Sequence, residues 1–502
     1  MRYIFGSRGA QVPLRCFLLA AACVGLALRF VRLGGQSLWV DEVLTLKNSY
    51  IGEGGMFTHF FSILQGPLVS LVMHFWAPLS SAEAVMRLPF AIAGALSVCA
   101  AYLLAKSLCD AWTALHTVFL VSFSPVLVWY SQEIRGYAFV VLASILATYF
   151  FVRWLGRPST RNALFYGICL LFGLVSNLSA AFVVAAHFVY LVLTPTKRKL
   201  VGRWLVAVFV VLLVFSPWMR EIIQRAQSAP QAGAGSEPLM GGGGLSLLSV
   251  PYSVFTYSYG YSLGPSVRAL QAGRAEAVSG AWIWIVLGAV GFAVPLIVGI
   301  ARLARTDRNL LILLLTWFLV PVCAVCLTSA LGAKAFSARY ALVAVPAYLM
   351  MVGHGLAAIT RTRFWPCVGL PVALLVISMW NYFAVPDYGR EDARAAAREI
   401  RAGFERGDAV LGYYSAEALE HYLSGVAPVE VFGADDLATA DARAAKCAEV
   451  AGAAERVWLF LCRERMIDGR GTIKAWFDQN LLLVRSEEFP GVRLHLYQRR
   501  GH

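Results

Sequence analysis

Charged residues are scarce in this sequence of 502 residues: they make up 14% of the chain, whereas hydrophobic residues make up 59%. A soluble globular protein carries about 25% charged residues, so this composition excludes that class. The apolar residues run in long segments from residue 13 to 385 and then stop. We therefore predict two units: a membrane domain over residues 1–385, with outer loops at 34–85 and 221–278, and a polar tail over 386–502.

The sequence also lacks metal-binding and nucleotide-binding motifs. Most of its cysteines fall in or beside apolar segments, without metal-ligand spacing, and there they pack as small hydrophobic residues. Cys447 and Cys462 stand apart in the tail, where they can pair in an oxidising compartment or remain free thiols. The tail carries no glycine-rich phosphate loop of the dinucleotide type. We expect no required cofactor, while a divalent cation on the outer carboxylates stays open.

Basic residues give the chain a net charge of +14, which raises the question of a nucleic-acid partner. Most of them lie in short loops between apolar segments and not on the basic face that nucleic-acid binding needs. Such loops mark the cytoplasmic side of a membrane protein, and here they hold Lys106 and residues 153–161, 197–203, 302–308 and 361–363. We expect no nucleic-acid partner, and a multi-pass plasma or inner membrane protein with a cytoplasmic N-terminus and an extracytoplasmic tail.

Apolar segments of membrane-spanning length, which takes ~20 residues, recur about eleven times. The first covers 13–33 and is uncleaved, because no small-residue cleavage site follows it. A shorter apolar stretch at 66–78 would invert every later loop if it crossed the membrane, so we predict an amphipathic helix at the outer interface. The other predicted spans are centred on 86–106, 112–130, 137–155, 161–176, 178–194, 203–220, 280–301, 309–330, 338–359 and 365–385.

The polar tail has the pattern of a small α/β domain, because predicted strands alternate with helices. The whole chain is therefore predicted to be a polytopic α-helical membrane protein with a small C-terminal α/β extracytoplasmic domain. The predicted elements of the tail are a helix over 391–406, a strand over 408–413, a helix over 416–423, a strand over 456–461 and one or two strands over 481–498.

Two outer motifs carry carboxylates. Asp41 and Glu42 follow the first span directly, and their adjacent side chains point in different directions, so one can face a reaction centre while the other orients it. A helix cap beside the membrane is the alternative. The second motif places Gln132, Glu133, Arg135 and Tyr137 at the outer surface, where ionisable groups near hydrocarbon are often functional. The alternative there is an ion pair between Glu133 and Arg135 that closes a turn.

A third outer motif carries two cations, Lys334 and Arg339, followed by Tyr340. Cations on the outer side run against the positive-inside trend, and an anionic ligand explains them, since Lys supplies a point charge and Arg a bidentate fork for phosphate. Contact with lipid headgroups is the alternative. The outer stretch 228–265, rich in glycine and tyrosine, is either a flexible connection or a lid or acceptor loop.

Together these motifs place acids, cations and aromatic rings on one outer face of a lipid-embedded protein, where nucleotide-activated donors are not available. An activated group must then arrive on a lipid carrier. A polyprenyl phosphate fits each element: its tail lies between spans, its phosphate meets Lys334 and Arg339, and a carboxylate deprotonates the acceptor hydroxyl.

These residues resemble the GT-C glycosyltransferase superfamily, specifically glycosyltransferase family 39, which includes protein O-mannosyltransferases and the lipid A aminoarabinose transferase. The resemblance covers the whole chain loosely and rests on the order and spacing of short motifs. These motifs are Leu38-Trp-Val-Asp-Glu, Gly66-Pro-Leu, Arg87-Leu-Pro-Phe, Ser131-Gln-Glu-Ile-Arg-Gly-Tyr137, Ser337-Ala-Arg-Tyr340 and Tyr388-Gly-Arg-Glu-Asp-Ala-Arg394.

The resemblance implies a polyprenyl-phosphate sugar donor and an inverting displacement, with Asp41 as general base and Glu42 as its helper. It assigns Glu133 to the sugar or acceptor, and the donor phosphate to three cations, Arg135, Lys334 and Arg339. Further substrate-binding candidates are Gln132, Tyr137, Tyr340 and His59. His59 is included because Gln65-Gly66-Pro67 departs from the family pattern, so that a family ligand is missing there, although a lone interfacial His is more often structural.

We therefore expect a membrane glycosyltransferase of the cell envelope that moves a hexosyl or pentosyl group onto a lipid, glycan or protein acceptor at the extracytoplasmic face. A polymerase or ligase using polyprenyl-pyrophosphate glycans is the nearest alternative and would need more cations. A polytopic transporter or flippase of lipid-linked glycans is the alternative from another class; it predicts charges within spans and interrupted helices in matching halves, and the sequence shows no such internal repeat. The sugar, the acceptor and the oligomeric state stay open.

Overall fold

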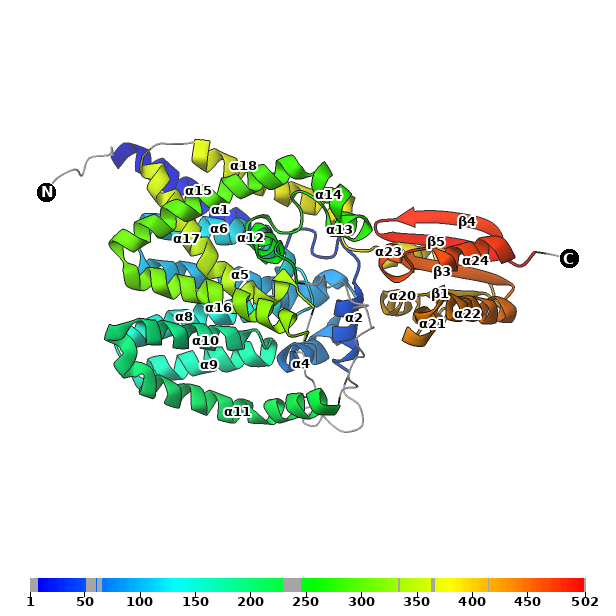
Figure 1. Cartoon of the computed structure of the whole chain (residues 1–502), viewed down its shortest axis with the longest axis horizontal. Helices are drawn as coiled ribbons and strands as arrows, with labels where there is room; N and C mark the ends of the chain where they lie inside the picture. Colours follow the sequence, from blue (N-terminus) through cyan, green and yellow to red (C-terminus); the bar gives the residue numbers. More distant parts are fainter. Residues whose placement is uncertain are drawn as a thin grey trace.

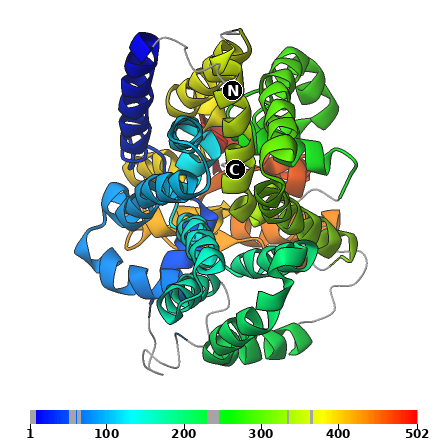
Figure 2. The same ribbon diagram turned by 90° about the vertical axis from the view of Figure 1, so that its left-hand side faces the viewer.

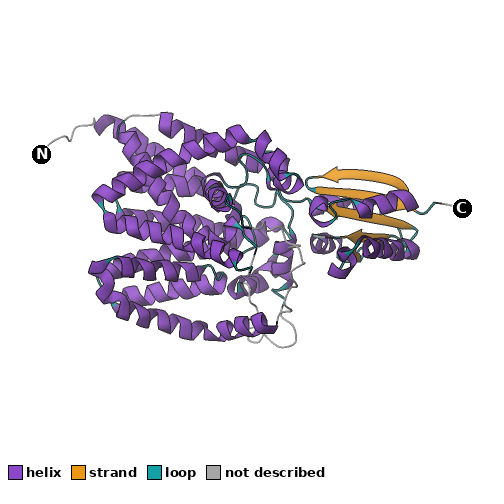
Figure 3. Ribbon diagram, viewed as in Figure 1, coloured by secondary structure: helices purple, strands orange, loops and turns teal. Residues whose placement is uncertain are grey.

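A computed structural model of the chain describes residues 8–50, 60, 66–228, 245–332, 335–362, 366–413 and 415–500. It consists of a large helical body and a small α/β domain formed by the C-terminal tail at one end of that body (Figures 1 and 3). Helix α1 (Arg8–Ala27) begins at the end of the helical body away from the tail (Figure 1). Viewed along this long axis, the described helices form an irregular bundle (Figure 2).

The helices of the body follow the predicted apolar segments, and each of the predicted spans contains helix. In chain order they are α1 (Arg8–Ala27), α2 (Val40–Lys47), α4 (Pro67–Trp76), α5 (Glu83–Leu108), α6 (Ala111–Phe123), α7 (Pro125–Ser131), α8 (Tyr137–Gly156), α9 (Thr160–Ser176), α10 (Ala180–Leu193), α11 (Val201–Ser228), α12 (Ser249–Tyr259), α13 (Val267–Ala272), α14 (Arg274–Gly280), α15 (Trp282–Thr306), α16 (Arg308–Ala330), α17 (Val345–Arg361) and α18 (Pro366–Ala384). Short 3₁₀ segments η1 (Ala77–Leu79), η2 (Pro195–Leu200), η3 (Ala338–Ala344) and η4 (Pro386–Tyr388) connect or extend them.

Among the described residues, seven helices are long and apolar enough to cross a membrane, or eight if the bent pair α6 and α7 is one span. The remaining predicted spans are shorter apolar helices: the described apolar part of α1, and α9 and α10. The stretch predicted to lie at the interface is also a short helix, α4 with η1. It packs beside α2 at the end of the body that carries the tail (Figure 1). The expected polytopic helical architecture is confirmed.

The bend of 53° between α6 and α7 has a local chemical cause. Pro125 has no N–H to donate to the Val121 carbonyl, so the helix breaks and the Ser124 side chain caps the new helix at Leu127 N. The Arg29 guanidinium, buried behind the break, donates to the freed Val121 and Ser122 carbonyls at 3.0 Å each. Because the second segment stops at Ser131, the break sets where the polar turn 132–136 begins.

The span formed by η3 and α17 lies at the centre of the body, and 94% of its most apolar 18 residues are buried. It packs closely on α15 through two glycines. A Cβ atom at Gly355 would come within 1.7 Å of the Pro295 carbonyl oxygen, and one at Gly299 within 2.0 Å of the Met351 carbonyl oxygen. Small residues at such crossings let two backbones approach in a membrane protein. This pair therefore fixes the central helix, which continues from the 3₁₀ segment that carries Arg339.

The tail folds into a five-stranded sheet with strand order β2-β1-β3-β5-β4. The strands β1 (Ala409–Gly412), β2 (Val429–Val431) and β3 (Arg456–Cys462) are parallel, whereas β5 (Val492–Gln498) runs antiparallel to β3 and to β4 (Leu482–Phe489). Leu411 pairs with Leu459, which in turn pairs with His495. The helices are α19 (Ala393–Gly403), α20 (Ala416–Leu423), α21 (Ala434–Ala438), α22 (Ala440–Ala453), α23 (Glu464–Ile467) and α24 (Thr472–Asn480). The predicted small α/β domain is confirmed, and β2 is an additional short strand.

The open question of a disulfide between Cys447 and Cys462 is answered by this sheet: both thiols are free and buried. Side chains alternate between the two faces of a strand. In β3, Leu459 and Leu461 therefore pack on the same side as Cys447, in a cluster with α22 and α24. Cys462 belongs to the other face, which packs with α19 and α20. The sheet thus lies between the two thiols, and a disulfide is not formed.

The tail is held against the first outer loop by direct hydrogen bonds. Arg394 pairs with the Glu83 carboxylate and donates to the carbonyls of Gly34 at 3.1 Å and Gly35 at 3.0 Å. Tyr422 donates to the same Glu83 carboxylate and accepts from the Leu38 N–H at 2.7 Å. These contacts place the start of the tail beside the first outer loop, where the predicted carboxylates lie.

Candidate active site

The three predicted polar motifs meet at the end of the helical body that faces the tail (Figure 1). Helix α2 carries Asp41 and Glu42, the turn between α7 and α8 carries Glu133, and η3 carries Arg339. A fourth element, the segment before α19, brings Arg390 into the same cluster. Residues far apart in the sequence are therefore brought into one acid and arginine cluster.

Asp41 is the accessible carboxylate of this cluster, with a side chain that is 19% exposed. Arg339 Nη1 lies 3.3 Å from its Oδ2. The Asp41 carbonyl accepts from Thr45 Oγ1 at 2.8 Å and from Arg135 Nη1 at 3.4 Å, so its backbone is held while the carboxylate is turned toward Arg339. A carboxylate that is positioned and reachable from solvent is suited to take a proton from a substrate.

Glu42 differs from its neighbour, because its side chain is fully buried and its carboxylate is saturated with donors. Arg87 binds both oxygens, at 2.9 Å and 2.7 Å, and Arg390 Nη1 adds a third contact at 2.8 Å. The Ile134 N–H donates at 3.0 Å. Burial alone raises the pKa of the Glu42 carboxyl, but the two guanidiniums and the hydrogen bonds outweigh it and lower this pKa to about 2. Glu42 therefore acts as a fixed anion that organises the loop, and it is not suited to proton transfer near neutral pH.

Glu133 is also fully buried, but it has far fewer partners than Glu42. Its Oε2 accepts from Arg390 Nη2 at 3.2 Å, and its Oε1 has no hydrogen-bond partner among the described residues. Burial raises the pKa of this carboxyl to about 7, against the opposing effect of Arg390. Both protonation states are therefore populated near neutral pH, as is common for carboxyl groups in active sites. Glu133 pairs with Arg390 and not with Arg135, the partner in the alternative interpretation of this motif.

Arg339 connects this carboxylate cluster to a group of aromatic rings. Its guanidinium lies 5.8 Å from the Trp39 ring centroid and 5.5 Å from that of Tyr340. The Tyr137 ring lies 4.7 Å from that of Tyr130, whose hydroxyl is 2.9 Å from the Tyr261 hydroxyl. Arginine over aromatic faces keeps its hydrogen-bonding edge free for a planar or tetrahedral anion. The aromatic rings and Arg339 therefore form one wall of the site beside Asp41.

Arg135, predicted to bind the donor phosphate, also supports α2. Its Nη1 lies 3.2 Å from Thr45 Oγ1, in addition to its contact with the Asp41 carbonyl. The start of α8 beside it depends on Gly136, where a Cβ atom would come within 2.1 Å of the Ser176 carbonyl oxygen. The motif containing Arg135 is thus fixed between α2 and the end of α9.

The prediction that Gln132 binds substrate does not fit its contacts. Its amide nitrogen donates to the carbonyls of Leu28, Arg29 and Val31 at 2.9 to 3.1 Å. Its amide oxygen accepts from the Tyr382 hydroxyl at 2.8 Å. The side chain is buried, and both of its donor hydrogens are used within the protein. Gln132 therefore joins the end of α1, the turn after α7 and α18.

We expect Gln132→Leu to lower the free energy of unfolding by about 1–3 kcal/mol, because the substitution leaves buried carbonyls and a tyrosine hydroxyl without partners. The variant should keep the wild-type KM for its substrates. Tyr382→Phe removes a single bond of the same network and should cost about 1 kcal/mol. Thermal unfolding in detergent and a KM measurement check this; a large rise in KM without loss of stability would show that Gln132 contacts substrate after all.

Two predicted site residues, His59 and Lys334, lie outside the described residues, as does the 229–244 part of the long outer loop. The part of that loop that is described supplies α12, whose Tyr257 hydroxyl donates to the Ala338 carbonyl at 3.0 Å. The described part of the loop therefore packs against η3 next to Arg339 and is hydrogen-bonded to it. Its predicted role as lid or acceptor loop stays a prediction.

Arg87 and Arg390 are the functional-site residues that the sequence did not single out. All five donor hydrogens of Arg87 are used: besides Glu42 it binds the carbonyls of Leu33, Gln36 and Ser37 at 2.7 to 3.0 Å. The sequence did hold one signal for both arginines, because each lies within a motif that resembles the family. Arg87 opens the motif at the start of the second span, and Arg390 lies in the motif that opens the tail.

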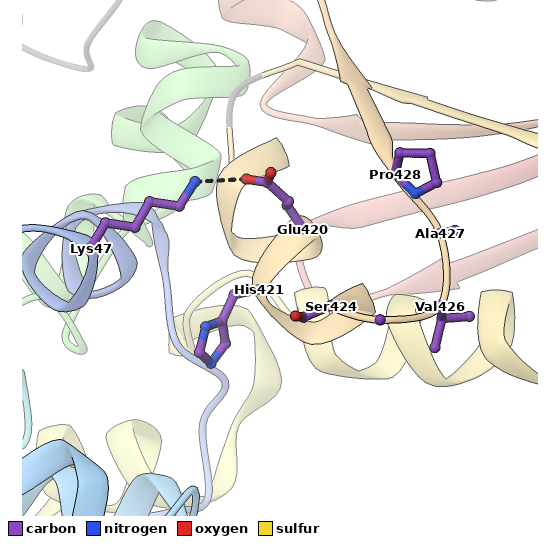
Figure 4. Close-up of a pocket in the computed structure, with 8 residues that line it drawn as sticks. Lys47, Glu420, His421, Ser424, Val426, Ala427 and Pro428 are labelled. Carbon is purple, nitrogen blue, oxygen red and sulfur yellow. Dashed lines mark hydrogen bonds and ion pairs between the residues drawn. The ribbon is translucent and has the colours of Figure 1, made fainter. Parts of the chain in front are cut away.

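The described residues contain no group of three or more His, Cys, Asp or Glu side chains that could hold a metal ion. The acids of the site are instead neutralised by arginines. An open pocket of about 540 Å³ lies beyond the C-terminal end of α2, between Lys47 and the turn after α20 (Figure 4). Lys47 pairs there with Glu420 at 2.6 Å, both about half exposed, and the burial of His421 and its neighbour Lys47 lower the pKa of that imidazole. None of the clustered acids and arginines lines this pocket, so the pocket is separate from the acid and arginine cluster.

Comparisons with known proteins agree with this architecture. The model of the dolichyl-phosphate-mannose-protein mannosyltransferase family matches residues 65–220. The structure of ArnT from Cupriavidus metallidurans in the apo state is similar, with a TM-score of 0.57 and 12% identity over 96% of this chain and 97% of that chain. No curated protein sequence matches the chain.

Two structures of the oligosaccharyltransferase from Archaeoglobus fulgidus are also similar. The one tethered with an acceptor peptide has a TM-score of 0.52 at 12% identity, covering 96% of this chain and 74% of that chain. The one in complex with an inhibitory peptide and a dolichol-phosphate has a TM-score of 0.51 at 13% identity, covering 95% and 73%. The chain therefore has the GT-C glycosyltransferase fold, and its predicted resemblance to the protein mannosyltransferase and aminoarabinose transferase type is confirmed.

Proposed function

We propose that this chain transfers a sugar from a polyprenyl-phosphate donor to a hydroxyl group of a lipid, glycan or protein at the extracytoplasmic face. The observation that carries the proposal is the pairing of a reachable carboxylate, Asp41, with a cation, Arg339, 3.3 Å away at the end of the membrane body. A sugar phosphate bound here would have a base and a phosphate-binding group within one site. The dolichol-phosphate in the complex of the archaeal oligosaccharyltransferase supports a lipid-phosphate donor for this fold.

In the proposed step, Asp41 takes the proton of the acceptor hydroxyl as its oxygen attacks the anomeric carbon. The bond between that carbon and the phosphate oxygen breaks, and the polyprenyl phosphate leaves with the electron pair. Attack opposite the leaving group inverts the anomeric configuration. Arg339 stabilises the negative charge on the departing phosphate, which is where preorganised cations contribute most. Lys334 and Arg135 are the further cations that we assign to the phosphate.

Of the other site residues, we assign three to substrate binding and one, Glu42, to the support of Asp41. We assign Glu133, whose buried Oε1 has no hydrogen-bond partner among the described residues, to a hydrogen bond with the sugar or the acceptor. Tyr137 and Tyr340 supply the aromatic wall on which a sugar ring packs. Glu42 holds α2 against Arg87 and the tail, so it supports the base by fixing its position.

The proposed orientation puts the tail outside the cytoplasm. Helix α5 begins at Glu83, beside the tail, and ends at Leu108, so Asp110 lies at the opposite end. There Asp110 pairs with Arg361 at 2.8 Å and Arg302 at 3.5 Å, two residues of the basic loops predicted to be cytoplasmic. The basic loops and the acid cluster thus lie at opposite ends of the body, as the positive-inside rule requires for a cytoplasmic N-terminus.

The function is tested by incubating the purified protein with a panel of radiolabelled polyprenyl-phosphate hexoses and pentoses and an extract of envelope lipids, glycans and proteins. Transfer from one donor class, with release of polyprenyl phosphate, is expected. Release that requires a polyprenyl pyrophosphate would favour a polymerase or ligase. If no donor is consumed, the same labelled lipids reconstituted in vesicles would test movement between leaflets, and such movement would replace the transferase by a flippase.

A further inference from the structure

Arg390 belongs to the tail but lies between two buried carboxylates of the membrane domain. Its Nη1 lies 2.8 Å from Glu42 and its Nη2 3.2 Å from Glu133. The side chain of Arg390 is 5% exposed, and those of the two acids at most 1%. The guanidinium also lies over the Trp129 ring, 5.6 Å from its centroid. One tail residue is therefore the shared counter-ion of two acids that belong to different outer loops.

The two acids do not depend equally on this arginine. Glu42 keeps a bidentate pair with Arg87 and a backbone hydrogen bond from Ile134 if Arg390 is removed. Among the described residues, Arg390 is the only donor to the Glu133 carboxylate for which the structure gives a contact, and the other oxygen has none. Removing Arg390 would thus leave a buried carboxyl without a hydrogen-bonded cation.

We propose that Arg390 is a positioning residue, supplied by the C-terminal domain, that favours the ionised form of Glu133 and orients it beside Asp41 and Arg339. The tail is then part of the active site. This inference rests on the proposed function only in assigning Glu133 a role in transfer. It requires a docked tail, and the contacts of Arg394 and Tyr422 with Glu83 supply that docking.

The electrostatic surroundings of Glu133 define what Arg390 does. The charged groups that face it are Arg390, Glu42, Arg339 and Asp41, and its titratable neighbours include Tyr130, Tyr137 and Tyr382. Burial raises the pKa of Glu133 to about 7, while Arg390 is the strongest influence that lowers it. Without Arg390 the pKa of Glu133 should rise further, and the carboxyl would be protonated at neutral pH.

The first test compares transfer rates between pH 5 and pH 9 for wild type, Arg390→Gln and Arg390→Lys. Loss of a cation in contact with a buried acid should move the acidic limb of the pH–rate profile to higher pH, by ~1 pH unit or more, in Arg390→Gln. Arg390→Lys should restore part of the shift. Arg456→Gln is the matched control, because it removes another tail arginine paired with a buried acid, Asp408 at 2.7 Å, and leaves the contacts that dock the tail intact: its limb should not move. Equal shifts in Arg390→Gln and Arg456→Gln, or none in either, would overturn the proposal.

A second test needs no donor. The pKa of Glu133 is raised from 4.5 to about 7 on folding, so the folded state holds the extra proton between these values and loses stability as the pH rises through them. In Arg390→Gln the melting temperature should keep falling above pH 7. Adding Glu133→Gln should raise the melting temperature of Arg390→Gln at pH 8 and remove this slope, because no buried carboxylate then lacks a cation. A double variant no more stable than Arg390→Gln would refute the inference, even if the chain transfers no sugar.

Discussion

Asp41→Asn is expected to lower the rate of sugar transfer by about 10²- to 10⁴-fold, the usual contribution of a general base. The amide has the shape of the carboxylate but cannot take the acceptor proton. Donor binding should change little, because Arg339 remains in place and loses only its partner at 3.3 Å. The measurement is initial-rate transfer from the active donor found in the panel, with donor binding measured in parallel.

A matched control for this variant is Asp110→Asn at the opposite end of the body. Asp110 also pairs with arginine, Arg361 at 2.8 Å, and it caps α6 by accepting from Trp112 N and Thr113 N. Asparagine is an equally good helix cap, so this variant should fold and transfer sugar at close to the wild-type rate. Transfer by Asp41→Asn at the same rate as Asp110→Asn would move the catalytic role to Glu133, whose pKa near 7 suits a base.

The second large effect is on stability. Arg87→Met should lower the free energy of unfolding by about 3–5 kcal/mol, the usual result of removing one partner of a buried ion pair. The Arg87 side chain is 1% exposed and binds Glu42 together with three carbonyls of the first outer loop. Methionine fills similar volume but leaves those acceptors without donors. Thermal unfolding in detergent, followed by aggregation or by thiol labelling of buried cysteines, measures the loss.

Arg361→Met provides the comparison, because Arg361 pairs with Asp110 but its side chain is 45% exposed. A pair this exposed contributes about 0–1 kcal/mol, so its loss should barely move the melting temperature. If the two variants unfolded at the same temperature, the buried network around Glu42 would not be what holds the first outer loop.

Much of the fold was predictable because membrane helices obey strong local rules. A bilayer requires long apolar helices and places the basic loops on one side, so the sequence indicates which segments are spans and which loops share a side of the membrane. The tail was predictable for a similar reason: residues 457–462 of β3 form a continuous apolar run, and such runs form buried strands. The three-residue strand β2 was missed because it is too short to show alternation.

The partners of buried polar groups were not predictable. Pro125 marks a break in the third predicted span, but only the folded chain shows that Arg29 binds the carbonyls freed there. Gln132 looked like a surface ligand because it sits among charged residues, yet it is buried and bonded to the segment after α1 and to α18. A sequence lists donors and acceptors; the approach of distant segments decides which of them meet.

By itself, the sequence determined the class of this protein and the outer motifs from which its site is built. Composition and periodicity act locally, so they fix which segments cross the membrane and which residues reach its surface. Only the tertiary structure decided the surroundings of the three acids. Asp41 stays reachable beside Arg339, Glu42 is neutralised by two arginines, and Glu133 keeps a raised pKa. That division follows from burial and charge pairing, which depend on side chains brought together from opposite ends of the chain.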